Sequence, residues 1–319
     1  MRALVVAGLG LMGAAGAAWG SAGVVRAQGV DAAAVADRFL PAERVPVAAG
    51  ESRQSCSAVL EEAAGEPAVV LAAYTSRAAG AVRVLRRVAD GTWSVVFDSP
   101  TAWQMPGTSC RVRLQDLDFD GRPEVFVYVA AVRANTGWVF RWDGAALTSI
   151  TPADASGDRV TSRLLDPTVY DLTHAGPLQV IAARRVENLP PGARSANPAY
   201  VYRVDAAGLR ADRAILAVMG FRADVDPRSN VRAFRLMVDS TGPYRLRVVN
   251  GERGGRNRVT GATVTVNDVV VLEPRDLTAG TEFATVTLPN LETQNRVTAV
   301  VSGAPESRVL LVFEDATRR

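Results

Sequence analysis

Short runs of alternating apolar and polar residues follow one another along most of the chain, separated by Gly, Pro, Asn and Asp. Alternation with a period of two places one set of side chains on each face of a β-strand. Only residues 31–40 have a helical pattern, which Pro41 ends. The pattern therefore predicts an all-β chain, with residues 28–49 forming an N-terminal helix and cap segment.

The strand pattern recurs with a period close to 55 residues. Gly65, Gly121 and Gly176 lie 56 and 55 residues apart, and an apolar run follows each of them closely. Residues 138–143 (WVFRWD) and 200–205 (YVYRVD) are a second match at corresponding places. Self-similarity at a fixed period is typical of repeated supersecondary units. We therefore expect three propeller-like β-meander repeats in residues 50–218, over residues 50–105, 106–160 and 161–218.

The repeat ends near residue 220, and a series of short β-rich runs follows. Asn267-Asp268 separates two of these runs and is typical of a tight hairpin turn, because Asn and Asp tolerate a positive φ. Such spacing predicts a small antiparallel β-sandwich over residues 225–319. The expected strands are residues 234–238, 244–249, 259–266, 269–272, 283–288, 296–302 and 309–313.

One loop of the second repeat has the composition of a calcium site. Its candidate ligands are Asp116, Asp118, Asp120, the backbone carbonyl of Arg122, and Glu124. Hard oxygen ligands of this kind suit Ca²⁺, and Gly121 permits the sharp turn between them. An EF-hand is excluded, because position twelve is Val127 where a bidentate Glu is required. The residues predict one structural calcium site, with an acidic surface turn as the alternative.

The pattern D-x-D-x-D-G-x-x-[DE] before an apolar strand resembles the loop of FG-GAP/VCBS repeats, the calcium-bearing blades of integrin-type β-propellers. In the third copy Thr173, Ala175 and Gln179 replace acids, and the first copy has Ala63 and Ala64 in the loop. We expect only the second copy to hold metal.

Three units are fewer than the roughly four to eight blades of closed propellers. We expect a propeller-like partial or compact assembly, with an open array as the alternative. If the repeats do not close, their edges can be covered by a neighbouring segment or by another chain in an oligomer.

The C-terminal part resembles an accessory β-sandwich module that is often appended to secreted bacterial proteins. Asp268 and Leu277 depart from that module's pattern. The resemblance implies a fold and export but no activity. It is carried by Val249-Asn250-Gly251, Arg258-Val259, Ala262-Thr263-Val264, Pro274-Arg275-Asp276-Leu277 and Gly303-Ala304-Pro305.

Residues 1–27 predict a signal peptide, with Arg2 before an apolar stretch and a cleavage site after Ala27. An uncleaved membrane anchor is the alternative. The motif G-x-G-x-x-G at residues 8–13 lacks the alternating strands and helices of a dinucleotide fold. We expect a secreted, periplasmic or cell-surface protein with no membrane span after cleavage.

Cleavage removes Arg2 and Arg26, so the formal net charge falls from +3 to +1. A nearly neutral chain does not favour nucleic acid as a partner. The arginine-rich run at residues 253–258 is expected to be a solvated loop, with an anion site as the alternative.

Cys56 and Cys110 occupy the same position in the first two repeats, each within the pattern C-x-[AV]-x-L before its loop. Equivalent strands of neighbouring units lie side by side, and paired cysteines are common in exported proteins. We predict a disulfide between them.

No nucleophile elbow, zinc-protease helix or P-loop occurs, and the single histidine, His174, lies in the degenerate third loop. We therefore predict a non-enzymatic binding, adhesion or cell-envelope protein with a glycan or protein partner. The alternative is a secreted hydrolase or lyase whose active site has no sequence motif. Candidate contact residues are Trp93, Trp103, Trp138, Trp142 and Tyr202, although Trp138 and Trp142 share a strand face with Phe140 that is typical of a core.

Overall fold

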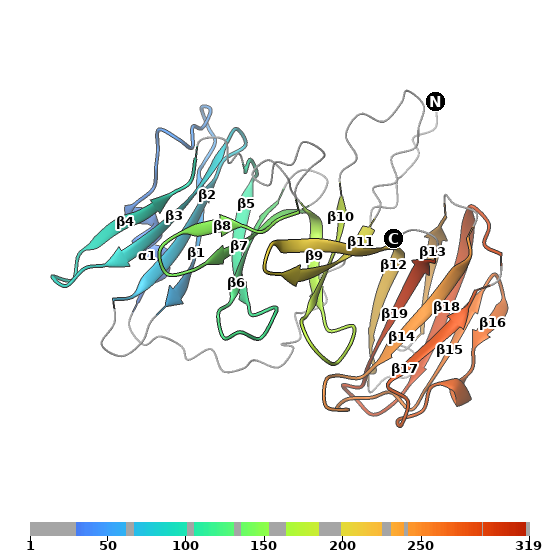
Figure 1. Cartoon of the computed structure of the whole chain (residues 1–319). Helices are drawn as coiled ribbons and strands as arrows, with labels where there is room; N and C mark the ends of the chain where they lie inside the picture. Colours follow the sequence, from blue (N-terminus) through green and yellow to red (C-terminus); the bar gives the residue numbers. More distant parts are fainter. Residues whose placement is uncertain are drawn as a thin grey trace, which may run out of the picture.

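The computed structural model describes residues 30–61, 67–100, 105–130, 135–152, 164–184, 199–224, 231–238, 242–288 and 290–316. Within these ranges the chain is almost entirely β-structure, with one α-helix, α1 (Ala32–Arg38), and a short 3-10 helix, η2 (Pro274–Asp276). The strands form antiparallel sheets (Figure 1), which confirms the all-β prediction. The expected signal peptide, Ala63 and Ala64 of the first loop, and Trp103 lie outside the described residues.

The first meander is a sheet of its own, in the order β1-β2-β3-β4. Its central strand β2 is buried along its whole length. One face of the sheet packs against helix α1, whose first turn is capped by the Asp31 carboxylate through the N–H groups of Ala33 and Ala34. The other face packs against the second meander. The strands are β1 (Gln54–Glu61), β2 (Val69–Thr75), β3 (Gly80–Arg87) and β4 (Trp93–Asp98).

The second and third meanders belong to one continuous sheet. They are joined where β7 pairs with β9, through Thr136 opposite Leu165 and Gly137 opposite Leu164. Gly137 permits this approach, because an added Cβ would lie 2.4 Å from Cγ of Pro167. The strands are β5 (Ser109–Gln115), β6 (Glu124–Ala130), β7 (Asn135–Trp142) and β8 (Leu147–Ser149), then β9 (Leu164–Tyr170), β10 (Gln179–Arg184), β11 (Ala199–Asp205) and β12 (Gly208–Arg222).

The three meanders stack face to face, with one apolar core between the first and second and another between the second and third. The core between the first and second meanders contains Trp138, Phe140 and Trp142 of β7, as their shared strand face predicts. The core between the second and third contains Phe126 and Tyr202. Burial on both faces explains why strands such as β2 and β6 are apolar at nearly every position rather than at alternate ones.

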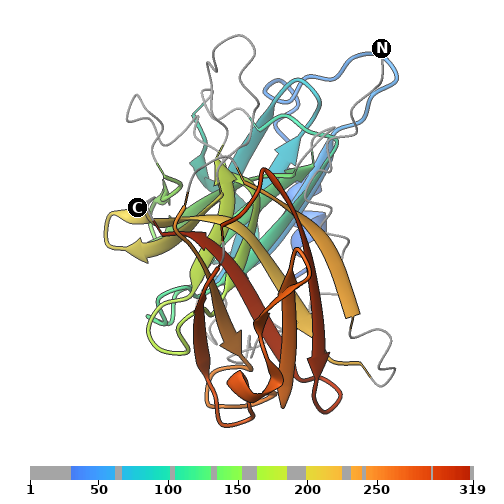
Figure 2. The ribbon, with the colours of Figure 1, turned by 90° about the vertical axis from the view of Figure 1, so that its right-hand side faces the viewer.

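A β-sandwich follows the third meander, and all the strand runs expected after residue 220 are present. One sheet has the order β17-β14-β19-β12 and the other the order β13-β18-β15-β16, with the largest apolar core between them (Figure 2). Asn267 and Asp268 form the expected turn, with φ of 48° and 65°. The strands are β13 (Val231–Met237), β14 (Tyr244–Asn250), β15 (Gly261–Val266), β16 (Val269–Leu272), β17 (Phe283–Thr287), β18 (Gln294–Ser302) and β19 (Arg308–Asp315).

Strand β12 links the two parts of the molecule. Its first half pairs with β11 of the third meander and its second half with β19 of the sandwich. It therefore runs through the boundary that the end of the repeat predicts near residues 218–225. A separate apolar core lies between the outer face of the third meander and the sandwich, and includes Leu172, Ile215 and Val312.

The described meanders form an open row rather than a ring, from β1–β4 at one end to the sandwich at the other (Figure 1). Closure into a ring, which the sequence left open, is not observed among the described meanders. Helix α1 covers the outer face of the first meander, and the sandwich covers that of the third. In a closed ring the first and last meanders would bury these outer faces against each other. Here helix α1 and the sandwich bury them instead.

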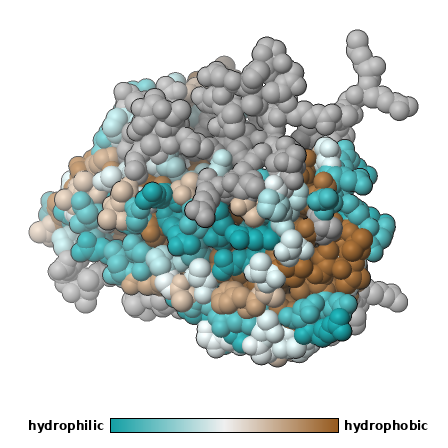
Figure 3. Space-filling model, turned by 45° about the vertical axis from the view of Figure 1, so that its right-hand side comes forward, coloured by the Kyte–Doolittle hydropathy of each residue, from teal (hydrophilic) through white to brown (hydrophobic). Residues whose placement is uncertain are grey.

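The outer sheet of the sandwich exposes apolar side chains on its solvent face. Val231, Val270 and Val300 are 49%, 51% and 39% exposed there. Figure 3 shows hydrophobic surface gathered on the right-hand side of the molecule, beside a hydrophilic band.

Candidate functional site

The acidic loop of the second meander connects β5 to β6. It brings Asp116, Asp118 and Asp120 together, with one oxygen atom from each carboxylate lying within 4.8 Å of the others. Asp116 and Asp118 are half-buried and Asp120 is exposed. Oxygen atoms bound to one Ca²⁺ at about 2.3–2.6 Å lie no more than about 5 Å apart, so the spacing fits this ion.

The loop is shaped by two residues in the left-handed region, Phe119 with φ of 62° and Gly121 with φ of 87°. Each aspartate accepts a backbone N–H with one oxygen. Gly121 donates to Asp116 Oδ2 at 3.0 Å, Asp120 to Asp118 Oδ1 at 3.4 Å, and Arg122 to Asp120 Oδ1 at 2.7 Å. Asp116 Oδ1 is buried and has no hydrogen-bond partner among the described residues. A buried carboxylate oxygen without a donor among the described residues calls for an explanation, because buried polar atoms are nearly always paired.

Glu124 lies apart from the three aspartates and has partners of its own. Its Oε2 accepts the Leu117 N–H at 2.9 Å, and its Oε1 accepts Arg141 Nη2 at 2.9 Å. The same Arg141 nitrogen is 3.1 Å from Asp118 Oδ2. Burial raises the pKa of Glu124, although the Leu117 N–H and Arg141 oppose this shift. The structure therefore brings together three of the four candidate carboxylates and gives the fourth to the loop backbone and Arg141.

Four carboxylates around a single guanidinium leave the site with a formal charge of −3. Carboxylates held this close repel one another, and a divalent cation relieves that repulsion. The donor set consists only of oxygen, which suits Ca²⁺ better than zinc or copper. The residues therefore fit the metal that the sequence predicts.

The third loop, between β9 and β10, has the same conformation and keeps only the first of the four acids, Asp171. His174 and Gly176 adopt φ of 52° and 71°, at the places of Phe119 and Gly121. Leu172 donates its N–H to Gln179 Oε1 at 2.8 Å, as Leu117 donates to Glu124. The repeat seen in the sequence thus extends to individual hydrogen bonds.

An arginine from the sandwich binds the third loop. Arg253 Nε lies 2.9 Å from Asp171 Oδ2, and Arg253 Nη2 donates to the Gly176 carbonyl at 2.7 Å. The other oxygen of Asp171 accepts the His174 N–H at 2.8 Å. His174 is buried and its Nδ1 lies 3.0 Å from Glu282 Oε1, another sandwich residue. Arg256 of the same run is exposed, as expected of a solvated loop, whereas Arg253 pairs with Asp171, and no sequence motif links these two residues.

The predicted disulfide is confirmed. Cys56 of β1 and Cys110 of β5 are bonded, with their Cα atoms 5.7 Å apart. The bond joins the first meander to the second, as the equivalent positions of the two cysteines in the repeat imply.

Most of the aromatic contact candidates belong to cores. Trp138 and Trp142 are only 3% and 5% exposed and form core, as their shared strand face predicts, while Tyr202 is 1% exposed, so the prediction that Tyr202 contacts a partner is wrong. Their burial follows from the stacking of the meanders, which covers both faces of the central sheet. Trp93 lies at the outer end of the first meander and lines a surface pocket.

In the described part of the chain, no helix has the length and apolar character needed to cross a membrane. Comparison with protein-family models and with curated proteins gives no match.

Comparison with solved structures gives distant matches to glycoside hydrolases. A Bombyx mori GH32 β-fructofuranosidase in complex with sucrose is 11% identical, with 85% of this chain and 79% of that chain covered and a TM-score of 0.27. A Schwanniomyces occidentalis fructofuranosidase in complex with fructosylnystose is 8% identical, with 81% and 69% covered and a TM-score of 0.22. A GH31 α-xylosidase from Xanthomonas citri is 11% identical, with 80% and 35% covered and a TM-score of 0.19.

The matched structures are those of enzymes, which contradicts the prediction that this chain is not an enzyme, and we withdraw that prediction. At these TM-scores the matches carry no substrate, catalytic residue or activity over to this chain.

Proposed function

We propose that the loop at residues 116–124 binds one calcium ion and that the chain is an exported, calcium-stabilised repeat protein. The observation that carries this proposal is a difference between two loops of the same shape. In the third loop both oxygens of Asp171 are paired, one with a backbone N–H and the other with Arg253. In the second loop the corresponding Asp116 has one oxygen buried without a partner among the described residues, beside two further carboxylates.

Asp116, Asp118 and Asp120 would hold the ion, each through one carboxylate oxygen. The ion supplies positive charge where the third loop has a guanidinium. Its role is structural, because the loop sets the turn between β5 and β6 and contacts the next meander through a hydrogen bond from the Leu178 N–H to the Leu117 carbonyl at 2.7 Å. Calcium in the second loop therefore stabilises the contact between the second and third meanders.

Export is supported by the disulfide between Cys56 and Cys110, since such bonds persist mainly in oxidising compartments. Extracellular calcium is abundant enough to fill a site of modest affinity, of the kind found in extracellular modules with Kd of roughly 10⁻⁴–10⁻³ M. The proposed location and the proposed metal are thus compatible.

Thermal unfolding of the purified chain in 10 mM CaCl₂ and in EGTA tests the proposal. A site with Kd near 10⁻⁴ M adds roughly 2.7 kcal/mol at a hundredfold excess of ligand, which raises the melting temperature by several degrees. Magnesium at the same concentration is the matched control, because it prefers a rigid octahedral site and keeps its water. An equal melting temperature in CaCl₂ and EGTA contradicts calcium binding, and an equal rise with magnesium contradicts selectivity for calcium.

A further inference from the structure

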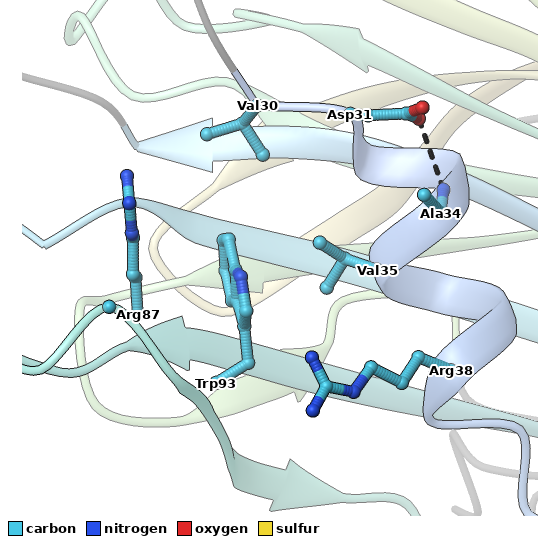
Figure 4. A pocket seen from close by; sticks show the side chains of 8 residues that line it. Val30, Asp31, Ala34, Val35, Arg38, Arg87 and Trp93 are labelled. Carbon is cyan, nitrogen blue, oxygen red and sulfur yellow. Dashed lines mark hydrogen bonds between the residues drawn. The ribbon is translucent and has the colours of Figure 1, made fainter.

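A surface pocket of about 320 Å³ lies on the first meander, between helix α1 and the start of β4 (Figure 4). Trp93 forms its aromatic wall, and Val30 and Val35 add apolar surface. Trp93 is directly opposite Arg87 in the pairing of β4 with β3, so the two side chains share one face of the sheet. Arg38 reaches the same pocket from helix α1. The pocket therefore combines one indole ring with two guanidinium groups from different elements.

The two arginines of the pocket have no partners among the described residues: Arg38 and Arg87 make no side-chain hydrogen bond or ion pair there. By contrast, Arg44 of the N-terminal segment and Arg83 of β3 are both paired with Asp98.

The one carboxylate in the lining, that of Asp31, accepts the N–H groups that begin helix α1 and points toward that helix in Figure 4. Two guanidinium groups thus remain available for an anion.

We propose that this pocket binds an anionic sugar residue of an extracellular saccharide. The sugar ring would lie against the Trp93 indole, because the C–H groups of a pyranose form an apolar face, while its carboxylate or sulfate would accept hydrogen bonds from Arg38 and Arg87. The volume is at the lower end of the range of roughly 300–1,000 Å³ for small-molecule sites, which suits one ring. Arg38, Arg87, Ala34 and Gly91 are exposed, so the site is open and the rest of the saccharide can continue into solvent.

This proposal is independent of the calcium site, which lies in the second meander. Binding is therefore expected to be the same in calcium and in EGTA. Failure of the saccharide experiment does not affect the calcium proposal, and a chain without calcium binding can still show saccharide binding.

Isothermal titration of the whole chain in EGTA tests the proposal with three probes. Trigalacturonic acid carries carboxylates, a sulfated galactose trisaccharide carries sulfates, and the neutral galactose trisaccharide carries neither. We expect at least one acidic probe to bind and the neutral one to bind about tenfold more weakly or not at all, because charge-assisted hydrogen bonds are lost. The stronger of the two acidic probes identifies the anionic group. Inorganic sulfate is a fourth titrant, and we expect it to bind more weakly than the better acidic probe, since it lacks the ring.

Arg38→Gln and Arg87→Gln remove one cation each at exposed positions, so both variants are expected to fold and to bind the acidic probe about tenfold more weakly. Arg235→Gln, an exposed arginine on the sandwich, is the matched control and should bind as the unchanged chain does. Trp93→Ala removes the aromatic wall and should weaken binding of the acidic trisaccharide but not of sulfate. If this variant fails to fold, Trp93→Phe, which keeps a smaller ring, should weaken binding in the same way. Any of four results overturns the proposal. Neither acidic probe binds, the neutral trisaccharide binds as tightly as the acidic ones, the two arginine variants bind the acidic probe as the unchanged chain does, or sulfate alone binds as tightly as the better acidic probe.

Discussion

The guanidinium of Arg253 lies over the ring of Phe119, with Cζ 4.4 Å from the ring centroid. Arg253 thus contacts both loops at once, because the same side chain pairs with Asp171 in the third loop. Phe119 belongs to the acidic loop and is 49% exposed. One sandwich residue therefore links a loop that has lost three of its four acids to a loop that has kept all four.

The first prediction concerns Arg253. Arg253→Met keeps much of the aliphatic stem but removes the charge, which leaves the buried Asp171 carboxylate without its ion pair. Arg253 is 38% exposed, so solvent screens part of the loss, and we expect a cost of about 1–2 kcal/mol in the free energy of unfolding. Urea denaturation measures this change.

The control for this prediction is Arg256→Met, an exposed arginine in the same turn, which should change stability little. In the double variant Arg253→Met with Asp171→Asn, the cost should be smaller than the sum of the two single costs, because the unpaired charge is gone. Additive costs would contradict an energetic link between Arg253 and Asp171.

The second prediction separates the metal site from an acidic turn. Asp118→Asn replaces one candidate carboxylate ligand by a neutral amide, so much of the stabilisation by calcium, up to roughly 2.7 kcal/mol for a hundredfold excess over Kd, should disappear. In EGTA the same change should cost little, because it also relieves repulsion among carboxylates within 4.8 Å of one another. Melting temperatures of both chains in CaCl₂ and in EGTA give the comparison.

Asp143→Asn is its matched control, since Asp143 also accepts backbone N–H groups in a turn, those of Ala145 and Ala146. This variant should lose the same small stability in both solutions. If Asp118→Asn behaves in the same way, the acidic loop is only a turn.

The third prediction concerns Glu124. Gln179 makes the equivalent bond in the third loop, so Glu124→Gln should keep the fold and the response to calcium. A chain that loses its response to calcium through this change would show that Glu124 is itself a ligand.

This variant also has a predictable pH dependence. Burial holds the pKa of Glu124 above its ordinary value of 4.5. A group with a raised pKa contributes stability below its ordinary pKa and loses it as the pH rises through the folded-state value. Glutamine does not titrate, so the stability of the variant relative to the unchanged chain should increase from pH 4 to pH 7. Denaturation in EGTA at the two pH values measures this, and a constant difference would contradict the shift.

Local pattern and repetition were sufficient to predict the strands and the three meanders. Alternation within a strand and the spacing of Gly65, Gly121 and Gly176 depend only on neighbouring residues and on the period. The disulfide was predictable because Cys56 and Cys110 occupy equivalent positions in adjacent units.

Features that depend on packing between distant segments were not predictable. Tyr202 has the composition of a contact residue, but stacking of the second and third meanders buries it. The pair of Arg253 with Asp171 spans 82 residues and has no periodic counterpart. The pocket at Trp93 requires helix α1 to lie on the outer face of the first meander, a placement that the helical pattern alone does not contain.

The fourth prediction concerns the disulfide as a link between sheets. The first meander is a separate sheet, and Cys56–Cys110 is a covalent bond from it to the second meander. Closing a loop of 54 residues stabilises a chain by about 4 kcal/mol on the entropic model. Replacing both cysteines by alanine should therefore lower the free energy of unfolding by up to that amount, and the first meander should become the first part to open.

Hydrogen exchange of β1–β4 compared with the sandwich, with and without dithiothreitol, tests both statements. Reductant should speed exchange in the first meander of the unchanged chain and have no effect on the alanine variant, whereas uniform acceleration across all sheets would mean that the bond stabilises the molecule as one cooperative unit.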